Sequence, residues 1–111
     1  MALTITGVPD IKYVLGESGR AQAYLLQPGA SDYVTGGYPI TASAVELGKL
    51  VGADLLMVSG TGASYNVNFV GTAPLTNPQT TLNMVVLSGS TQVAASTDLS
   101  GASFAALFLG W

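Results

Sequence analysis

Short apolar runs, separated by turn-forming residues, recur along the chain at a spacing of roughly ten residues. Each run has the length of a β-strand, and the separators are rich in Gly, Ser, Asn, Asp and Pro. The runs cover 11–15, 21–26, 55–58, 65–70, 81–87, 91–95 and 103–109. This pattern predicts an all-β fold, an antiparallel β-sandwich or a jelly-roll-like barrel.

Alternation is clearest in the run 65–70. Tyr65, Val67 and Phe69 fall on one side of a strand, and Asn66 and Asn68 fall on the other. We therefore expect one face of this strand to lie in the core and the other to be solvated or at an interface.

Two local signals add to the strand pattern. The segment 87–93, LSGSTQV, is typical of a β-hairpin whose turn lies at Ser-Gly-Ser. Ser43 with Glu46 three residues later fits a helical capping box, and Gly48 can supply a left-handed stop. We expect one short helical turn near 43–48 that covers one end of the sandwich.

The length bounds the organisation of the chain. At 111 residues we expect a single β-sandwich domain over 1–111, whose first few residues could form an extended arm. Hydrophobic residues make up 49% of the chain, which is enough apolar surface to offset the entropy of ordering. A folded domain is expected.

Charged residues make up 8% of the chain, against roughly 25% in typical soluble domains. After Asp54 the only charged residue is Asp98. Such a surface can be merely polar, rich in Ser, Thr, Asn and Gly. The interpretation we favour is that copies of the chain or a larger partner cover much of it.

Few residues of the chain are of the types that carry out catalysis or bind metals. The chain has no His and no Cys, and its three basic residues form no patch. The acidic residues are isolated in sequence, so an enzyme would need two carboxylates to meet in space. We predict no catalytic, cofactor-binding or metal-binding residue, no cofactor and no enzymatic activity. With a net charge of −3 and no long apolar run, neither nucleic acid nor a membrane is an expected partner.

The connection 31–48 concentrates special residues. Gly36 and Gly37 predict a tight turn with positive φ, and Pro39 restricts Tyr38 to an extended conformation. Tyr33 and Tyr38 flank this turn, and they are the aromatic residues for which contact with a partner is the leading hypothesis. The alternative is an ordinary ordered connection with buried tyrosines.

Two stretches resemble a known family. They are DYVTGGYPIT with LGKLVGADLLMV, within 32–58, and VAASTDLSGASFAALFLGW, 93–111. Both resemble the small bacteriophage head proteins that decorate or cement capsids. The glycine motif of that family matches Thr35, Gly36, Gly37 and Tyr38, and its closing turn matches Asp98, Leu99, Ser100 and Gly101.

The resemblance implies a compact β-rich fold that binds at many symmetric positions on a shell and has no activity. It implies the major capsid protein and further copies of this chain, as a homotrimer, as partners. It places the protein on the capsid surface of a virion, after synthesis in the host cytoplasm. The candidate interface or turn residues are Tyr33, Thr35, Gly36, Gly37, Tyr38, Asp98, Leu99 and Ser100.

One departure from the family lies in the last strand, which often has more basic residues where this chain has Ala105, Ala106 and Leu107. An apolar last strand suits a subunit interface or a plain core. The alternative function is a carbohydrate- or cell-surface-binding β-sandwich module of a phage fibre or an extracellular assembly. Such a module would bind its ligand through Tyr33 and Tyr38.

Overall fold

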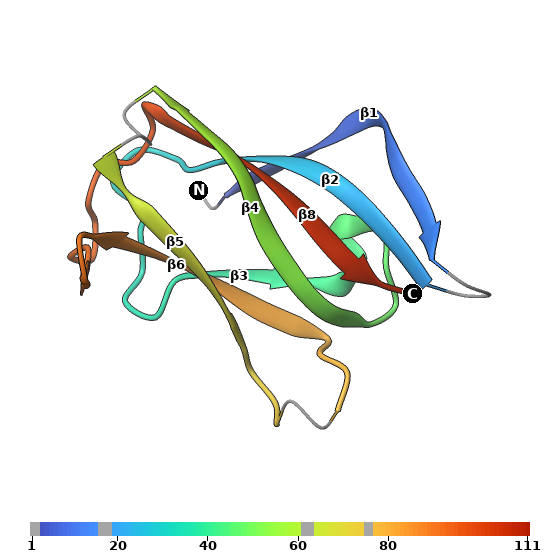
Figure 1. Ribbon diagram of the computed structural model, residues 1–111. Coiled ribbons are helices and arrows are strands. Elements are labelled where there is room, and N and C mark those ends of the chain that lie inside the picture. The colour runs from blue at the N-terminus through green and yellow to red at the C-terminus, as the bar shows by residue number, and fades with distance from the viewer. Residues whose placement is uncertain (1–2, 16–18, 61–63, 75–76) are drawn as a thin grey trace.

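A computed structural model describes residues 3–15, 19–60, 64–74 and 77–111, of which 8–15 are described by their strand pairing alone. Within these residues the chain forms two antiparallel β-sheets that pack as a sandwich (Figure 1). The only helical element in the described part is a 3-10 turn. The predicted all-β sandwich is therefore confirmed.

The first sheet contains the C-terminal strand in its interior. Strand β8 pairs with β2 on one side and β4 on the other, and β1 extends the sheet beyond β2. In sheet order β1, β2, β8, β4, the strands span Thr4–Leu15, Gly19–Gln27, Ala102–Gly110 and Leu50–Gly60.

The second sheet has the order β3, β6, β5, with the short β7 also paired to β6. These strands span Tyr38–Thr41, Thr81–Ser88, Asn66–Gly71 and Thr91–Gln92. The hairpin between β6 and β7 is confirmed, with Gly89 at a φ of 66° in its turn. Strand β7 ends at Gln92, well before the predicted end of the run 91–95.

Besides the first part of β4, 50–54, two strand segments were missed by the sequence pattern. One is 4–10, the first part of β1, where Gly7 and Pro9 interrupt the apolar run. The other is β3, which contains Pro39. Strand β3 lies at the edge of its sheet and pairs only with β6, and an edge strand tolerates a residue without an amide hydrogen.

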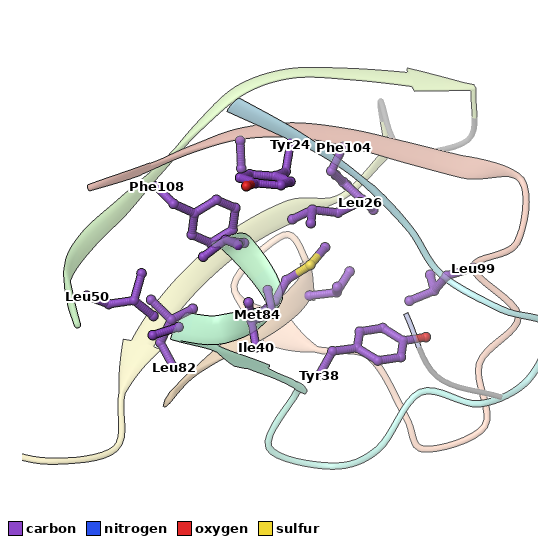
Figure 2. Close-up of a cluster of buried hydrophobic side chains, with 14 of the residues drawn as sticks. Tyr24, Leu26, Tyr38, Ile40, Leu50, Leu82, Met84, Leu99, Phe104 and Phe108 are labelled. Carbon is purple, nitrogen blue, oxygen red and sulfur yellow. The ribbon is translucent and has the colours of Figure 1, made fainter. Parts of the chain in front are cut away.

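The core lies between the sheets, where alternate side chains of facing strands meet (Figure 2). Phe104 and Phe108 of β8 are fully buried, as is Met84 of β6. The ring of Phe108 packs edge-on against Tyr24, at 6.0 Å between centroids, and against Phe69 of the other sheet, at 5.8 Å. Such edge-to-face contacts stabilise the sandwich beyond simple area burial.

The short helical turn is shorter than predicted and starts earlier. It is the 3-10 turn η1, Ala42–Val45. Thr41 is its N-cap, with its Oγ1 accepting a hydrogen bond from the amide of Ala44 at 3.3 Å. The predicted capping role of Ser43 is wrong, because β3 keeps the chain extended up to Thr41 and the turn begins directly after it.

The end of η1 also differs from the prediction. Glu46, at a φ of 60°, is the left-handed residue that ends the turn, and Gly48 is not. The Glu46 carboxylate accepts a hydrogen bond from the Tyr24 hydroxyl at 2.9 Å. The amide of Gly48 instead donates to the carbonyl of Trp111 at 2.7 Å, which holds the C-terminal residue in place.

Candidate interaction surfaces

The tyrosine loop, residues 31–38, joins β2 to β3 at one end of the sandwich. Gly36 and Gly37 have φ values of 99° and 102°, which confirms the predicted positive-φ turn. The turn is closed by a hydrogen bond of 2.9 Å from the Gly37 amide to the Val34 carbonyl. A Cβ atom on Gly37 would lie 2.5 Å from the carbonyl oxygen of Met84, so this glycine also permits a close backbone approach.

Both tyrosines of the loop are buried. Tyr33 is 2% exposed and Tyr38 is 1% exposed, and their rings pack edge-on at 5.5 Å between centroids. The expectation that these rings face a partner is corrected, because both lie in the core of the single chain. The structure matches the alternative, an ordered connection with buried tyrosines.

Hydrogen bonds inside the chain occupy the two hydroxyl groups. The Tyr38 hydroxyl donates to Asp32 Oδ1 at 2.7 Å. The Tyr33 hydroxyl donates to Gln92 Oε1 at 2.8 Å and accepts from the Val86 amide at 3.2 Å. Burial, and then the bond to Asp32, raises the pKa of Tyr38 well above its ordinary value.

The second candidate segment forms a turn before β8. Asp98 Oδ1 accepts hydrogen bonds from the Ser100 amide at 3.0 Å and from the Ser100 hydroxyl at 2.6 Å. These bonds lower the pKa of Asp98. Leu99, between them, is fully buried, so of the two roles considered for it, interface or turn, it has the turn role and anchors the turn in the core.

The two segments that carry the family resemblance are neighbours in the structure. Strand β4 of the first pairs along its length with β8 of the second. Their loops also meet, since the Ser96 amide donates to the Tyr33 carbonyl at 2.8 Å and the charge of Asp98 contributes to the raised pKa of Tyr38.

Above the buried tyrosines, one set of exposed residues surrounds this end of the sandwich. We call it the loop rim, and it consists of Val34, Thr35, Gly36, Asp98 and Ser100. Val34 is 55% exposed, and Asp98 is the only charged member. Four of the eight candidate residues predicted from the sequence therefore lie at the surface here, and the other four lie beneath them.

A second surface was missed by the sequence analysis. Strands β2 and β8 turn alternate side chains toward the core, such as Leu26 and Phe104, so the residues between them face outward. These outward residues are apolar, and together with Met57 of β4 we call them the apolar face. It consists of Ala21, Ala23, Leu25, Met57, Ala105, Leu107 and Leu109.

The exposure of side chains on the apolar face rises from β2 across β8 to the edge strand β4. The two alanines of β2 are buried, the residues of β8 are partly exposed, and Met57 of β4 is 69% exposed. The signal in the sequence was the run 103–109, which is apolar in both phases of its alternation. Such a run is typical of a strand that is covered on both faces.

The outward face of the second sheet is different. Asn66 and Asn68 of β5 lie opposite Leu87 and Val85 of β6, and Asn83 continues the row. We call this the amide face. It confirms the expected alternation of Asn66 and Asn68 with inward apolar residues, and its amides lie beside the apolar side chains of Val70, Val85 and Leu87.

The described residues contain neither a cluster of metal ligands nor a membrane-spanning helix. No three acidic side chains there lie together as metal ligands. No helix in the same part of the chain has the length and hydropathy to cross a bilayer.

Comparison with family models, curated proteins and solved structures found no match to this chain.

Proposed function

We propose that the chain is a non-enzymatic virion structural protein that binds the outside of a bacteriophage capsid as a decoration or cement protein. The observation that carries this proposal is the meeting of the two segments that resemble such proteins. They supply paired strands and touching loops, although more than thirty positions separate them in sequence. Together they build one exposed surface, the loop rim.

The loop rim suits a weak contact that is repeated many times. It is small, almost uncharged, and held rigid from below by Tyr33 and Tyr38. A rigid contact loses little conformational freedom on binding. When an assembly carries several copies, weak contacts of this kind combine into tight attachment.

The proposed partners are the major capsid protein and other copies of this chain, and the proposed location is the capsid surface after synthesis in the host cytoplasm. The low charge fits this setting, because a nearly neutral surface has little attraction for nucleic acid or anionic membranes. The homotrimer implied by the resemblance stays a prediction, which the mass of the purified protein tests.

The alternative of carbohydrate binding loses its physical basis. It relied on Tyr33 and Tyr38 as stacking platforms for sugar rings, and both rings are buried. We therefore do not propose it as a second function.

Co-sedimentation with expanded, undecorated capsids of the phage that encodes the chain tests the proposal. We expect saturable binding at a fixed ratio to the capsid protein, and a higher temperature of particle disruption. Val34→Glu should weaken binding by at least about tenfold, since it buries a charge in an apolar contact. Asn68→Glu, an exposed change on the amide face, is the matched control and should bind like the native chain.

Two results would contradict the proposal. Absence of the native chain from the capsid pellet removes the function itself. Equal binding by Val34→Glu and the native chain removes the loop rim as the contact.

A further inference from the structure

The apolar face has a regular arrangement of large and small side chains. Strands β2 and β8 place three outward pairs directly opposite each other. Each pair joins one leucine to one alanine: Ala21 with Leu109, Ala23 with Leu107, and Leu25 with Ala105. The face therefore has a projection beside a depression at each of the three levels.

We propose that two copies of the chain associate through their apolar faces, related by a twofold axis that runs parallel to the strands between β2 and β8. This rotation keeps each level along the strand and exchanges the two strands. It sets β8 of one copy on β2 of its partner, so every leucine lies opposite an alanine. Such self-complementarity is what an isologous interface requires.

The size of the face suits a weak, concentration-dependent dimer. The apolar face lies on three strands about 4.8 Å apart and about 30 Å long for nine residues, so it offers about 430 Å² per copy. Two copies would bury about 860 Å², at the low end of the interface sizes seen in weak complexes. Outward faces of twisted sheets can pack about 10 Å apart with their strands nearly aligned.

The one charge on the described outward side of β2, β8 and β4 lies away from the centre of the contact. On the outward side, Asp54 of β4 is level with Leu107, one strand away from the axis. The twofold rotation carries the second Asp54 to the opposite edge, so the two carboxylates lie about 15 Å apart, beyond the screening length of about 8 Å. The centre of the interface contains only alanine and leucine.

Sedimentation of the purified chain, without capsids, tests the proposal. We expect the native chain to have twice its monomer mass of 11.2 kDa. Leu107→Glu should weaken association by at least about tenfold, because it places a charge at the centre of the apolar contact. Val85→Glu is the control, since Val85 is partly exposed on the opposite outward face. A native monomer or a native trimer would overturn the proposal.

An exchange of side chains tests the registration of the two copies. Ala23→Leu makes the face more apolar but sets leucine against leucine across the axis, so it should weaken the dimer. The double variant Ala23→Leu with Leu107→Ala restores a leucine opposite an alanine and should recover association. If Ala23→Leu strengthens association, or the double variant fails to recover it, the twofold packing is wrong.

Met57 gives a readout that needs no substitution. It is 69% exposed, whereas Met84 is fully buried and serves as an internal reference. Oxidation of Met57 by peroxide should slow as protein concentration rises and the dimer forms. A rate of Met57 oxidation independent of concentration, in a range where the mass doubles, would place the contact elsewhere.

The proposed dimer is an alternative to the homotrimer that the resemblance implies, and the mass of the purified chain decides between them. It does not depend on attachment to a capsid. Its mass is measured on the chain alone, and capsid attachment is tested at the loop rim with Val34→Glu. Either proposal can therefore fail while the other stands.

Discussion

The tyrosine loop and the apolar face differ in how far their side chains are buried and bonded within the chain. In the loop, the hydroxyl of Tyr33 and that of Tyr38 are hydrogen-bonded within the chain, and both rings are buried. On the apolar face, Leu107 and Met57 point away from the core and remain partly or largely exposed. Residue types that suggest binding are thus used for folding, while plain leucines and a methionine form the exposed part of the apolar face.

This difference separates the expected effects of mutation. Changes in the tyrosine loop should lower the stability of the single chain. Changes on the apolar face should alter association between chains and leave the fold intact, because the side chains there contribute little to the core.

The largest effect is expected at Gly37. Gly36 and Gly37 share nearly the same φ, but only Gly37 lies against the backbone of Met84. Gly36→Ala should cost about 1 kcal/mol, from the left-handed conformation alone. Gly37→Ala should cost about 3 kcal/mol more, because the backbone must also shift. Chemical denaturation of the two variants measures the difference, and equal losses would show that the close approach is unimportant.

The next largest effect is expected for Tyr33→Phe. This change removes one oxygen that accepts from the buried Val86 amide and donates to Gln92. The free energy of unfolding should fall by about 2 kcal/mol, the usual cost of removing a partner from a buried donor. The sedimentation mass should not change. If Tyr33→Phe keeps the native stability but changes the sedimentation mass, Tyr33 contributes to an interface between chains and not to folding.

On the apolar face, the expected effect depends on concentration. If the native chain is a dimer that dissociates on unfolding, each tenfold rise in concentration should stabilise it by about 1.4 kcal/mol per mole of dimer. Leu107→Glu should remove this dependence, and Val85→Glu should keep it. Thermal unfolding across a concentration series measures both. A concentration-independent midpoint for the native chain would contradict the dimer.

Local patterns in the sequence were sufficient for most of the fold. Alternation in 65–70, the hairpin at 87–93 and the paired glycines 36–37 each depend on neighbouring residues only. Their strand, turn and φ values were therefore predictable. The N-cap of η1 was not, since it depends on where β3 stops pairing with β6.

The candidate surfaces depended on contacts distant in sequence. Tyr33 is buried through bonds to Gln92 and Val86, which are 59 and 53 positions away, and no local pattern reveals them. For the run 103–109, the sequence left both a subunit interface and a plain core open. The structure assigns Phe104 and Phe108 to the core and Leu107 to the outward face.

The smallest effect is expected from alkaline pH. Burial, and then the hydrogen bond to Glu46, raises the pKa of Tyr24 from 10.0 to about 12. An unfolded chain loses this proton near its ordinary pKa, while the folded chain keeps it, so stability is full below pH 10 and declines as pH rises toward 12.

The Tyr24 contribution should be about 1 kcal/mol, less than a full two-unit shift allows, because Glu46 is exposed and solvent screens the pair. Tyr38 should add a loss in the same direction, since its pKa is also raised. Denaturation midpoints across this pH range should fall less steeply in Tyr24→Phe and in Tyr38→Phe than in the native chain. If Tyr38→Phe leaves the slope unchanged, the Tyr38 hydroxyl reaches water, and the tyrosine loop becomes available to a partner after all.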